Sequence, residues 1–203
     1  MTDPNYTHAV MVVDRSGSMI NMKNDAEGGV RAFIEEQQAI DSKMTFTLIQ
    51  FDSVIETVVD FQNIQKVNGY TLNPRGGTAL YDAIAYAINA TGKNLRALPE
   101  EERPGNVLIT IVTDGQENSS IEHNSSSIKK LIEEQENKYS WVFSFIGAGI
   151  HADQGKEIGI EHTVAYAGAP SAGYGAVSHS LAVSRSAVGV PLAASYSVPE
   201  TVE

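Results

Sequence analysis

The chain has 203 residues, a length typical of one domain or of one domain with a modest extension. It contains no cysteine, which excludes disulfide bonds and thiolate metal sites and fits a cytoplasmic location. The formal net charge of −11 opposes binding to the phosphate backbone of nucleic acid. The N-terminal residues do not resemble a signal peptide, and every apolar run is far shorter than the roughly 20 residues of a membrane span. We therefore expect neither nucleic acid nor a membrane as a partner.

The first part of the chain alternates apolar, strand-like runs with one amphipathic segment. The run 8–14 (HAVMVVD) is nearly continuous in β-branched and apolar residues, which is typical of a strand covered on both faces. A helix is expected over about 20–40, where apolar residues mostly recur every three or four positions. The runs 44–52 and 54–60 have almost no gap between them, which predicts an antiparallel hairpin.

The second part continues the alternation. A loop marked by a Gly-Gly pair precedes an alanine-rich helix expected over about 79–98. We then expect strands at 107–113, 141–146 and 163–166 and helices at 125–138 and 152–158. A last helix is predicted from the helical spacing of Val177, Leu181, Ser184 and Val188. The alternation predicts an α/β fold with a largely parallel sheet, in one domain over 1–190 followed by a loosely held tail at 191–203.

Oxygen-bearing side chains gather where the first strand ends, in the segment DRSGSM (14–19). Asp14 is the last strand residue, and Ser16 and Ser18 follow at alternate positions of a turn that Gly17 allows to fold tightly. Such strand ends are where open α/β sheets bind ligands, and hard oxygen ligands suit Mg²⁺ or Mn²⁺. Taken alone, the same segment is equally typical of a helix cap, in which Ser and Asp satisfy free N–H groups.

Two later segments supply further oxygen ligands. Thr78 follows a Gly-Gly pair at the start of the second expected helix, and Asp114 ends the strand 107–113. Each has an alternative interpretation, because Thr78 could be a helix N-cap and Asp114 an ordinary turn residue. If the strands that end at Asp14 and Asp114 are neighbours, however, all three loops emerge at the same edge of the sheet.

Together the three segments resemble the metal-ion-dependent adhesion site of von Willebrand factor type A domains. The likeness covers about residues 6–166, and the matching positions are Asp14, Ser16, Ser18, Thr78 and Asp114. The resemblance implies a doubly wound, mostly parallel sheet with one antiparallel edge strand and helices on both faces. It also implies that the serines bind one Mg²⁺ or Mn²⁺ directly, and that the threonine and the aspartates contact it directly or through water. A carboxylate of a partner protein would then fill an open position.

Further residues are candidates for the rim of this site. Gly77 precedes the threonine, and Asp82 lies one helical turn after it, where it could orient the ligands without touching the ion. A solvated helix residue is the favoured interpretation of Asp82. Glu117 and Asn118 are expected to border the ion and to shape partner choice. Asp52 could approach the same edge or be a simple turn residue.

The leading functional prediction is a metal-dependent protein-binding module that recognises Asp or Glu of a partner. Stand-alone bacterial and phage domains of similar kind look like intracellular adaptors, so we expect a cytoplasmic adaptor or assembly factor. One alternative is a structural subunit of a virion or larger complex, in which the metal is a folding device. The other is a metal-dependent hydrolase or phosphotransferase. Against an enzyme, the sequence shows no nucleophile with a paired base, no G-x-S-x-G and no phosphate-binding G-x-x-x-x-G-K-[ST] motif.

Overall fold

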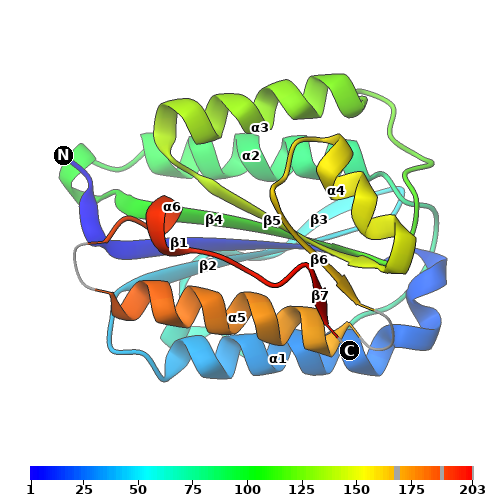
Figure 1. Ribbon diagram of the computed structural model, residues 1–203, viewed down its shortest axis with the longest axis horizontal. Coiled ribbons are helices and arrows are strands. Elements are labelled where there is room, and N and C mark those ends of the chain that lie inside the picture. Colours follow the sequence, from blue (N-terminus) through cyan, green and yellow to red (C-terminus); the bar gives the residue numbers. More distant parts are fainter. Residues whose placement is uncertain (167–169, 188–189, 203) are drawn as a thin grey trace.

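A single seven-stranded sheet with helices on both faces forms the computed structural model of the chain (Figure 1), which describes residues 1–166, 170–187 and 190–202. The strand order is β3-β2-β1-β4-β5-β6-β7, and only β3 runs antiparallel to its neighbour. The expected hairpin and the mostly parallel sheet with one antiparallel edge strand are therefore confirmed. The strands are β1 (Asp3–Asp14), β2 (Met44–Phe51), β3 (Ile55–Asn63), β4 (Pro104–Thr113), β5 (Val142–Ala148), β6 (His162–Tyr166) and β7 (Thr201–Val202).

Helices α1 (Lys23–Gln38) and α5 (Ser171–Ser186) cover one face of the sheet, and α2 (Leu80–Arg96), α3 (Ser125–Tyr139) and α4 (Asp153–Glu157) cover the other (Figure 1). The first expected helix is divided, because a 3₁₀ helix (Gly17–Met22) precedes α1. The last expected helix is confirmed as α5, although Val188 lies outside the described residues. None of the described helices is both long and apolar enough to cross a membrane.

The apolar sequence of the central strand β1 follows from its burial on both faces of the sheet. In β1, Met11 and Val13 belong to the core under α1 and α5, while Val10 and Val12 belong to the core under α2 and α3. All four side chains are at most 1% exposed. Because both faces of the strand are covered, alternation of polar and apolar residues is absent and the run is continuously apolar.

Strands β1 and β4 are hydrogen-bonded neighbours, with Val13 opposite Val112. Asp14 and Asp114 therefore leave the sheet side by side at its carboxyl end. The prediction of a single site required the strands that end at Asp14 and Asp114 to be neighbours, and this pairing shows that they are.

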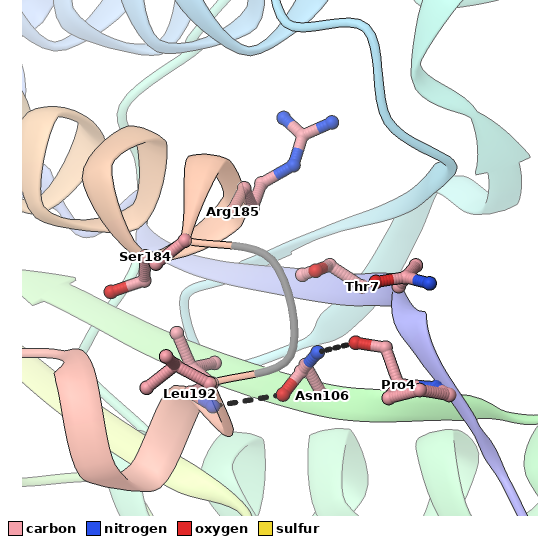
Figure 2. Close-up of a pocket in the computed structure, with 9 residues that line it drawn as sticks. Pro4, Thr7, Asn106, Ser184, Arg185 and Leu192 are labelled. Carbon is pink, nitrogen blue, oxygen red and sulfur yellow. Dashed lines mark hydrogen bonds between the residues drawn. The ribbon is translucent and has the colours of Figure 1, made fainter.

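The C-terminal segment packs along the domain. The backbone N–H of Leu192, which begins the short helix α6 (Leu192–Ser195), donates to the Asn106 side chain at 2.9 Å, and Asn106 in turn donates to the Pro4 carbonyl (Figure 2). Leu192 and Tyr196 are buried, and Thr201 in β7 pairs with Ala165 in β6. Residue 203 of the expected tail lies outside the described residues, and the division of the chain at residue 190 stays a prediction.

Candidate metal centre

Three loops meet at the carboxyl end of the sheet, following β1, preceding α2 and following β4. The backbone N–H of Gly17 donates to the carbonyl of Gly76 at 3.2 Å, and that of Asn118 donates to the carbonyl of Thr78 at 3.0 Å. The loops that carry the candidate ligands are thus joined directly through their main chains.

Asp14 is completely buried and its carboxylate is held from two sides. One oxygen accepts the backbone N–H of Ser16 and the other accepts the Thr113 hydroxyl, each at 2.6 Å. Burial raises the pKa of Asp14 to about 6; the hydrogen bonds from Thr113 and Ser16 lower it, and the nearby Asp114 carboxylate raises it further. The carboxylate is fixed in a place where a negative charge is unfavourable without a cation.

A chain of hydroxyl and carboxylate oxygens links the first loop to the third. The hydroxyls of Ser16 and Ser18 lie 3.0 Å apart, and Ser18 donates to Asp114 Oδ1 at 2.7 Å across 96 positions of sequence. Asp114 is 8% exposed, and burial raises the pKa of its carboxyl group. Four candidate ligands therefore form one contiguous group.

Thr78 joins this group from the second loop. A Cβ atom at Gly115 would lie 3.5 Å from Ser18 Oγ and 3.6 Å from Thr78 Oγ1, so both hydroxyls border the same point. Thr78 is 2% exposed, and its hydroxyl makes no hydrogen bond to any other described residue. It does not cap α2, whose N-cap residue is Ala79 without a capping side chain, and Ser16 does not cap the 3₁₀ helix that follows it.

The donor set fits a hard divalent cation. All five side chains offer oxygen, with two carboxylates and three hydroxyls, which suits Mg²⁺ or Mn²⁺ better than zinc. Within the described parts of the chain, no group of three or more His, Asp or Glu side chains could hold a metal. A cation here would consequently depend on the hydroxyl ligands as well as on Asp14 and Asp114.

Glu117 ties the third loop to the start of α2. Its carboxylate accepts the backbone N–H groups of Tyr81 at 3.0 Å, Ser119 at 2.8 Å and Ser120 at 2.7 Å. From the sequence, Glu117 is expected to border the ion and to shape partner choice. In the structure both of its oxygens are occupied by hydrogen bonds within the loops.

Asp82 has a related role one turn further into α2. Its two carboxylate oxygens accept the backbone N–H groups of Ile121 at 2.7 Å and His123 at 2.8 Å. The interpretation of Asp82 as a solvated helix residue is therefore wrong, because the β4–α3 loop folds over it. Asp82 and Glu117, with the N–H groups that they bind, are called the loop clasp below.

Asn118 and Gly77 bring the second and third loops into contact. Asn118 Oδ1 accepts the backbone N–H of Thr78 at 2.9 Å. A Cβ atom at Gly77 would overlap the Ser119 hydroxyl and approach Asn118 Oδ1 to 2.9 Å, so only glycine fits here without rearrangement. Both residues thus set the position of Thr78 through its backbone.

Two residues at the site escaped sequence analysis. Thr113 orients Asp14, and the only local signal for it was its place immediately before Asp114. Gln154 in α4 donates to the Gly115 carbonyl at 3.0 Å and accepts the Glu117 N–H at 3.2 Å. Nothing near Gln154 in the sequence indicates this contact, because its partners lie in another loop.

An ion-pair group joins the first two loops beside the site, with Arg15 and Asp52 buried, Arg75 exposed and Glu56 half-buried. Arg15 Nε and Arg75 Nε both donate to Asp52 Oδ2 at 2.8 Å, and Glu56 contacts both guanidinium groups. Burial alone would raise the pKa of Asp52, but the hydrogen bond from Arg75 and the other contacts hold it below its ordinary value. Asp52 does reach the site's edge, as a contact between loops.

Comparison with protein families identifies one match. The model described as von Willebrand factor type A domain matches residues 9–116, a range that includes every candidate ligand. Comparison with curated proteins gives no match.

Solved structures share the fold at low sequence identity. Proximal thread matrix protein 1 from the mussel byssus superposes with a TM-score of 0.61 at 14% identity, over 88% of this chain and 46% of that one. The ArnB paralog VWA2 from Sulfolobus acidocaldarius gives 0.52 at 21% identity, over 85% and 44%. A von Willebrand factor type A protein from Catenulispora acidiphila gives 0.52 at 15% identity, over 75% and 36%. The chain therefore spans less than half the length of these proteins.

Proposed function

The chain belongs to the von Willebrand factor type A domain family, and from this premise we propose that it is a metal-dependent protein-binding module. In this proposal one divalent cation is held at the carboxyl end of the sheet by Asp14, Ser16, Ser18, Thr78 and Asp114. A carboxylate of a partner protein completes the coordination of the ion.

One observation carries the proposal: the hydrogen-bonded series Ser16–Ser18–Asp114, with the unpartnered Thr78 hydroxyl beside it. Short polar side chains at the ends of buried strands normally pair with helix N–H groups. Here the hydroxyls of Ser16 and Thr78 cap no helix, and the two carboxylates are buried with raised pKa values. A divalent cation would stabilise both carboxylates and use the hydroxyls as ligands.

Mg²⁺ or Mn²⁺ is the proposed ion, bound weakly. Hydroxyl groups supply much of the ligand set, and Mg²⁺ gives up its water reluctantly. Recognition of a carboxylate then follows from charge. A domain with a net charge of −11 does not attract an acidic partner through its overall field, so the attraction has to come from the local ion.

Binding is favoured over catalysis by the surroundings of the serines. Ser16 and Ser18 hydrogen-bond to each other, Ser18 also donates to Asp114, and no histidine or lysine among the described residues hydrogen-bonds to either hydroxyl. A serine nucleophile needs an adjacent base. We propose that the chain is a cytoplasmic adaptor or assembly factor. The alternative is a structural subunit of a larger assembly, and the second experiment below distinguishes the two.

The first experiment tests the ion. Isothermal titration calorimetry with Mg²⁺, and water-proton relaxation with Mn²⁺, should show one site that Asp14→Ala abolishes. Asp25→Ala is the matched control, because Asp25 is an exposed aspartate in the first turn of α1 and is not one of the five candidate ligands. Equal binding by Asp14→Ala and the wild type would overturn the metal assignment.

The second experiment tests the partner. Proteins captured from the native host in Mg²⁺ are compared with those captured in chelator, by the wild type, Thr78→Ala and Thr91→Ala. Both threonines are 2% exposed, but Thr91 lies within α2, away from the site. An adaptor should lose its partner in chelator and bind it about tenfold more weakly after Thr78→Ala, with Thr91→Ala unchanged. A partner retained at full affinity in chelator would instead support the structural subunit.

A further inference from the structure

A second concave site lies at the opposite, amino end of the sheet. It is a cavity of about 350 Å³ between the carboxyl-terminal halves of α2 and α3, above the start of β4. Small-molecule pockets usually measure about 300–1,000 Å³. The hollow in Figure 2 is much smaller, at about 20 Å³, which is room for roughly one water molecule. The apolar walls of the larger cavity are Ile88, Leu95, Val107, Leu131, Tyr139 and Trp141.

Cationic groups border this apolar space. The cavity is lined by Arg96 and Arg103, and its one acidic lining residue, Glu134, already pairs with Lys138 at 2.6 Å. Arg103 Nε donates to the Leu98 carbonyl at 2.9 Å, while its terminal nitrogens, and the whole Arg96 guanidinium, bind no other group in the described residues. Neither guanidinium group forms a salt bridge among the described residues, although the Arg103 charge helps to lower the pKa of the neighbouring Glu100 carboxyl group. In a chain with a net charge of −11, these two cations beside one apolar cavity favour an anionic ligand.

Gly92 helps to keep the cavity open. It lies in the interior of α2, where glycine costs up to about 1 kcal/mol relative to alanine. It lines the cavity, and a Cβ atom here would first meet Arg96 Nη1, at 3.2 Å. The missing side chain therefore leaves room next to the Arg96 guanidinium.

We propose that this cavity binds a small amphipathic carboxylate, with its apolar body between α2 and α3 and its carboxylate paired with Arg96 and Arg103. The aliphatic and aromatic walls remove the apolar body from water. The planar guanidinium groups match a carboxylate in shape and charge, and the apolar surroundings strengthen that pairing. The cavity lies at the opposite end of the sheet from the metal centre and shares no residue with it.

Trp141 provides a direct signal for the test. It is the one tryptophan of the chain, it is 6% exposed, and it lines the cavity. Decanoate, titrated below its micellar concentration, should change the tryptophan fluorescence in a saturable manner. Decanol has the same apolar body without the charge and should bind roughly tenfold more weakly. Equal binding of the two would overturn the carboxylate assignment, and no fluorescence change with either would overturn the site.

Paired variants of α2 locate the binding. Arg96→Gln should weaken decanoate binding about tenfold, whereas Lys93→Gln removes the same charge from the same helix outside the cavity and should have little effect. Gly92→Leu should fill the cavity and abolish the fluorescence change. Its control is Gly28→Leu in α1, where a Cβ atom would meet nothing within 4 Å. If Arg96→Gln and Gly92→Leu bind decanoate as tightly as their controls do, decanoate binds elsewhere.

Chelator separates this inference from the proposed function. Decanoate binding should be identical in Mg²⁺, in chelator and in Asp14→Ala, since no residue lining the cavity belongs to the metal centre. Dependence of decanoate binding on the metal would show that the ligand sits at the carboxyl end and would overturn the second site.

Discussion

The two ends of the sheet differ in how they are built. At the carboxyl end, three loops are held together by hydrogen bonds between polar side chains and backbone groups, with Ser18 bound to Asp114 and Asn118 to Thr78. At the amino end, helices α2 and α3 leave an apolar cavity beside Arg96 and Arg103. One end offers oxygen ligands to a cation, and the other offers guanidinium groups to an anion.

The difference follows from the parallel arrangement of the strands, which brings the ends of β1 and β4 to the same edge of the sheet. The strands β1 and β4 must release their chains at the same end, so short polar residues placed there meet without further help. At the amino end the first residues of β4 form only part of the apolar wall. The cavity depends mainly on where two helices end and on the missing side chain at Gly92.

The largest expected effect is on the free energy of unfolding, and it comes from a buried histidine near the amino end of the sheet. His8 is in β1 opposite Val107, a residue that lines the cavity, and burial lowers its pKa to about 3 from 6.5. Below about pH 6.5 the unfolded chain takes up a proton at His8 that the folded chain does not, so stability is lost as the pH falls toward about 3. Between about pH 7 and pH 5 this amounts to roughly 2 kcal/mol.

His8→Leu isolates this effect. Urea unfolding of both proteins in chelator, at both pH values, cancels the other titrating groups, including Asp14. The free energy of unfolding of His8→Leu relative to the wild type should rise by about 2 kcal/mol on acidification. A difference independent of pH would mean that burial does not lower the pKa of His8 relative to the unfolded chain.

The loop clasp is expected to give the second largest effect. Asp82→Ala removes the acceptor for the N–H groups of Ile121 and His123 and should lower the free energy of unfolding by roughly 1.5 kcal/mol. Asp25→Ala is the control, because both aspartates lie in the first turn of a helix and only Asp82 binds a loop. Mg²⁺ affinity should fall with Asp82→Ala, whereas decanoate binding should not. If both variants lowered the free energy of unfolding equally, the effect would come from the loss of a negative charge at a helix N-terminus and not from the loop.

The smallest change in stability is expected for Asp114→Asn. Burial raises the pKa of Asp114, so removing its charge should leave the melting temperature in chelator unchanged or a few degrees higher. The Mg²⁺-induced rise of the wild type should disappear. Asp52→Asn is the contrasting control, since Asp52 is paired with Arg15 and Arg75 and its loss should lower the melting temperature. A large decrease in chelator for Asp114→Asn would show that the residue is structural.

The sequence by itself determined most of the elements and the identity of the candidate ligands. Strand runs such as 107–113 and the apolar face of α2 are local patterns, and β4 and α2 form within a few residues of their expected bounds. The helix 20–40 was less accurate, because the 3₁₀ turn at Gly17–Met22 depends on contacts of the first loop with Gly76. The spacing of apolar residues is a property of neighbouring residues, so it predicts strands and helices without any knowledge of the tertiary structure.

Only the tertiary structure decided what each polar side chain does. Asp82 and Glu117 look like free acidic residues in the sequence, but they bind backbone N–H groups in another segment. Gln154 reaches Gly115 across 39 positions, and Ser18 reaches Asp114 across 96. A hydrogen bond is decided by distance in space, and the sheet order sets that distance. The cavity beside Arg96 arises in the same way, from helix packing that no local pattern encodes.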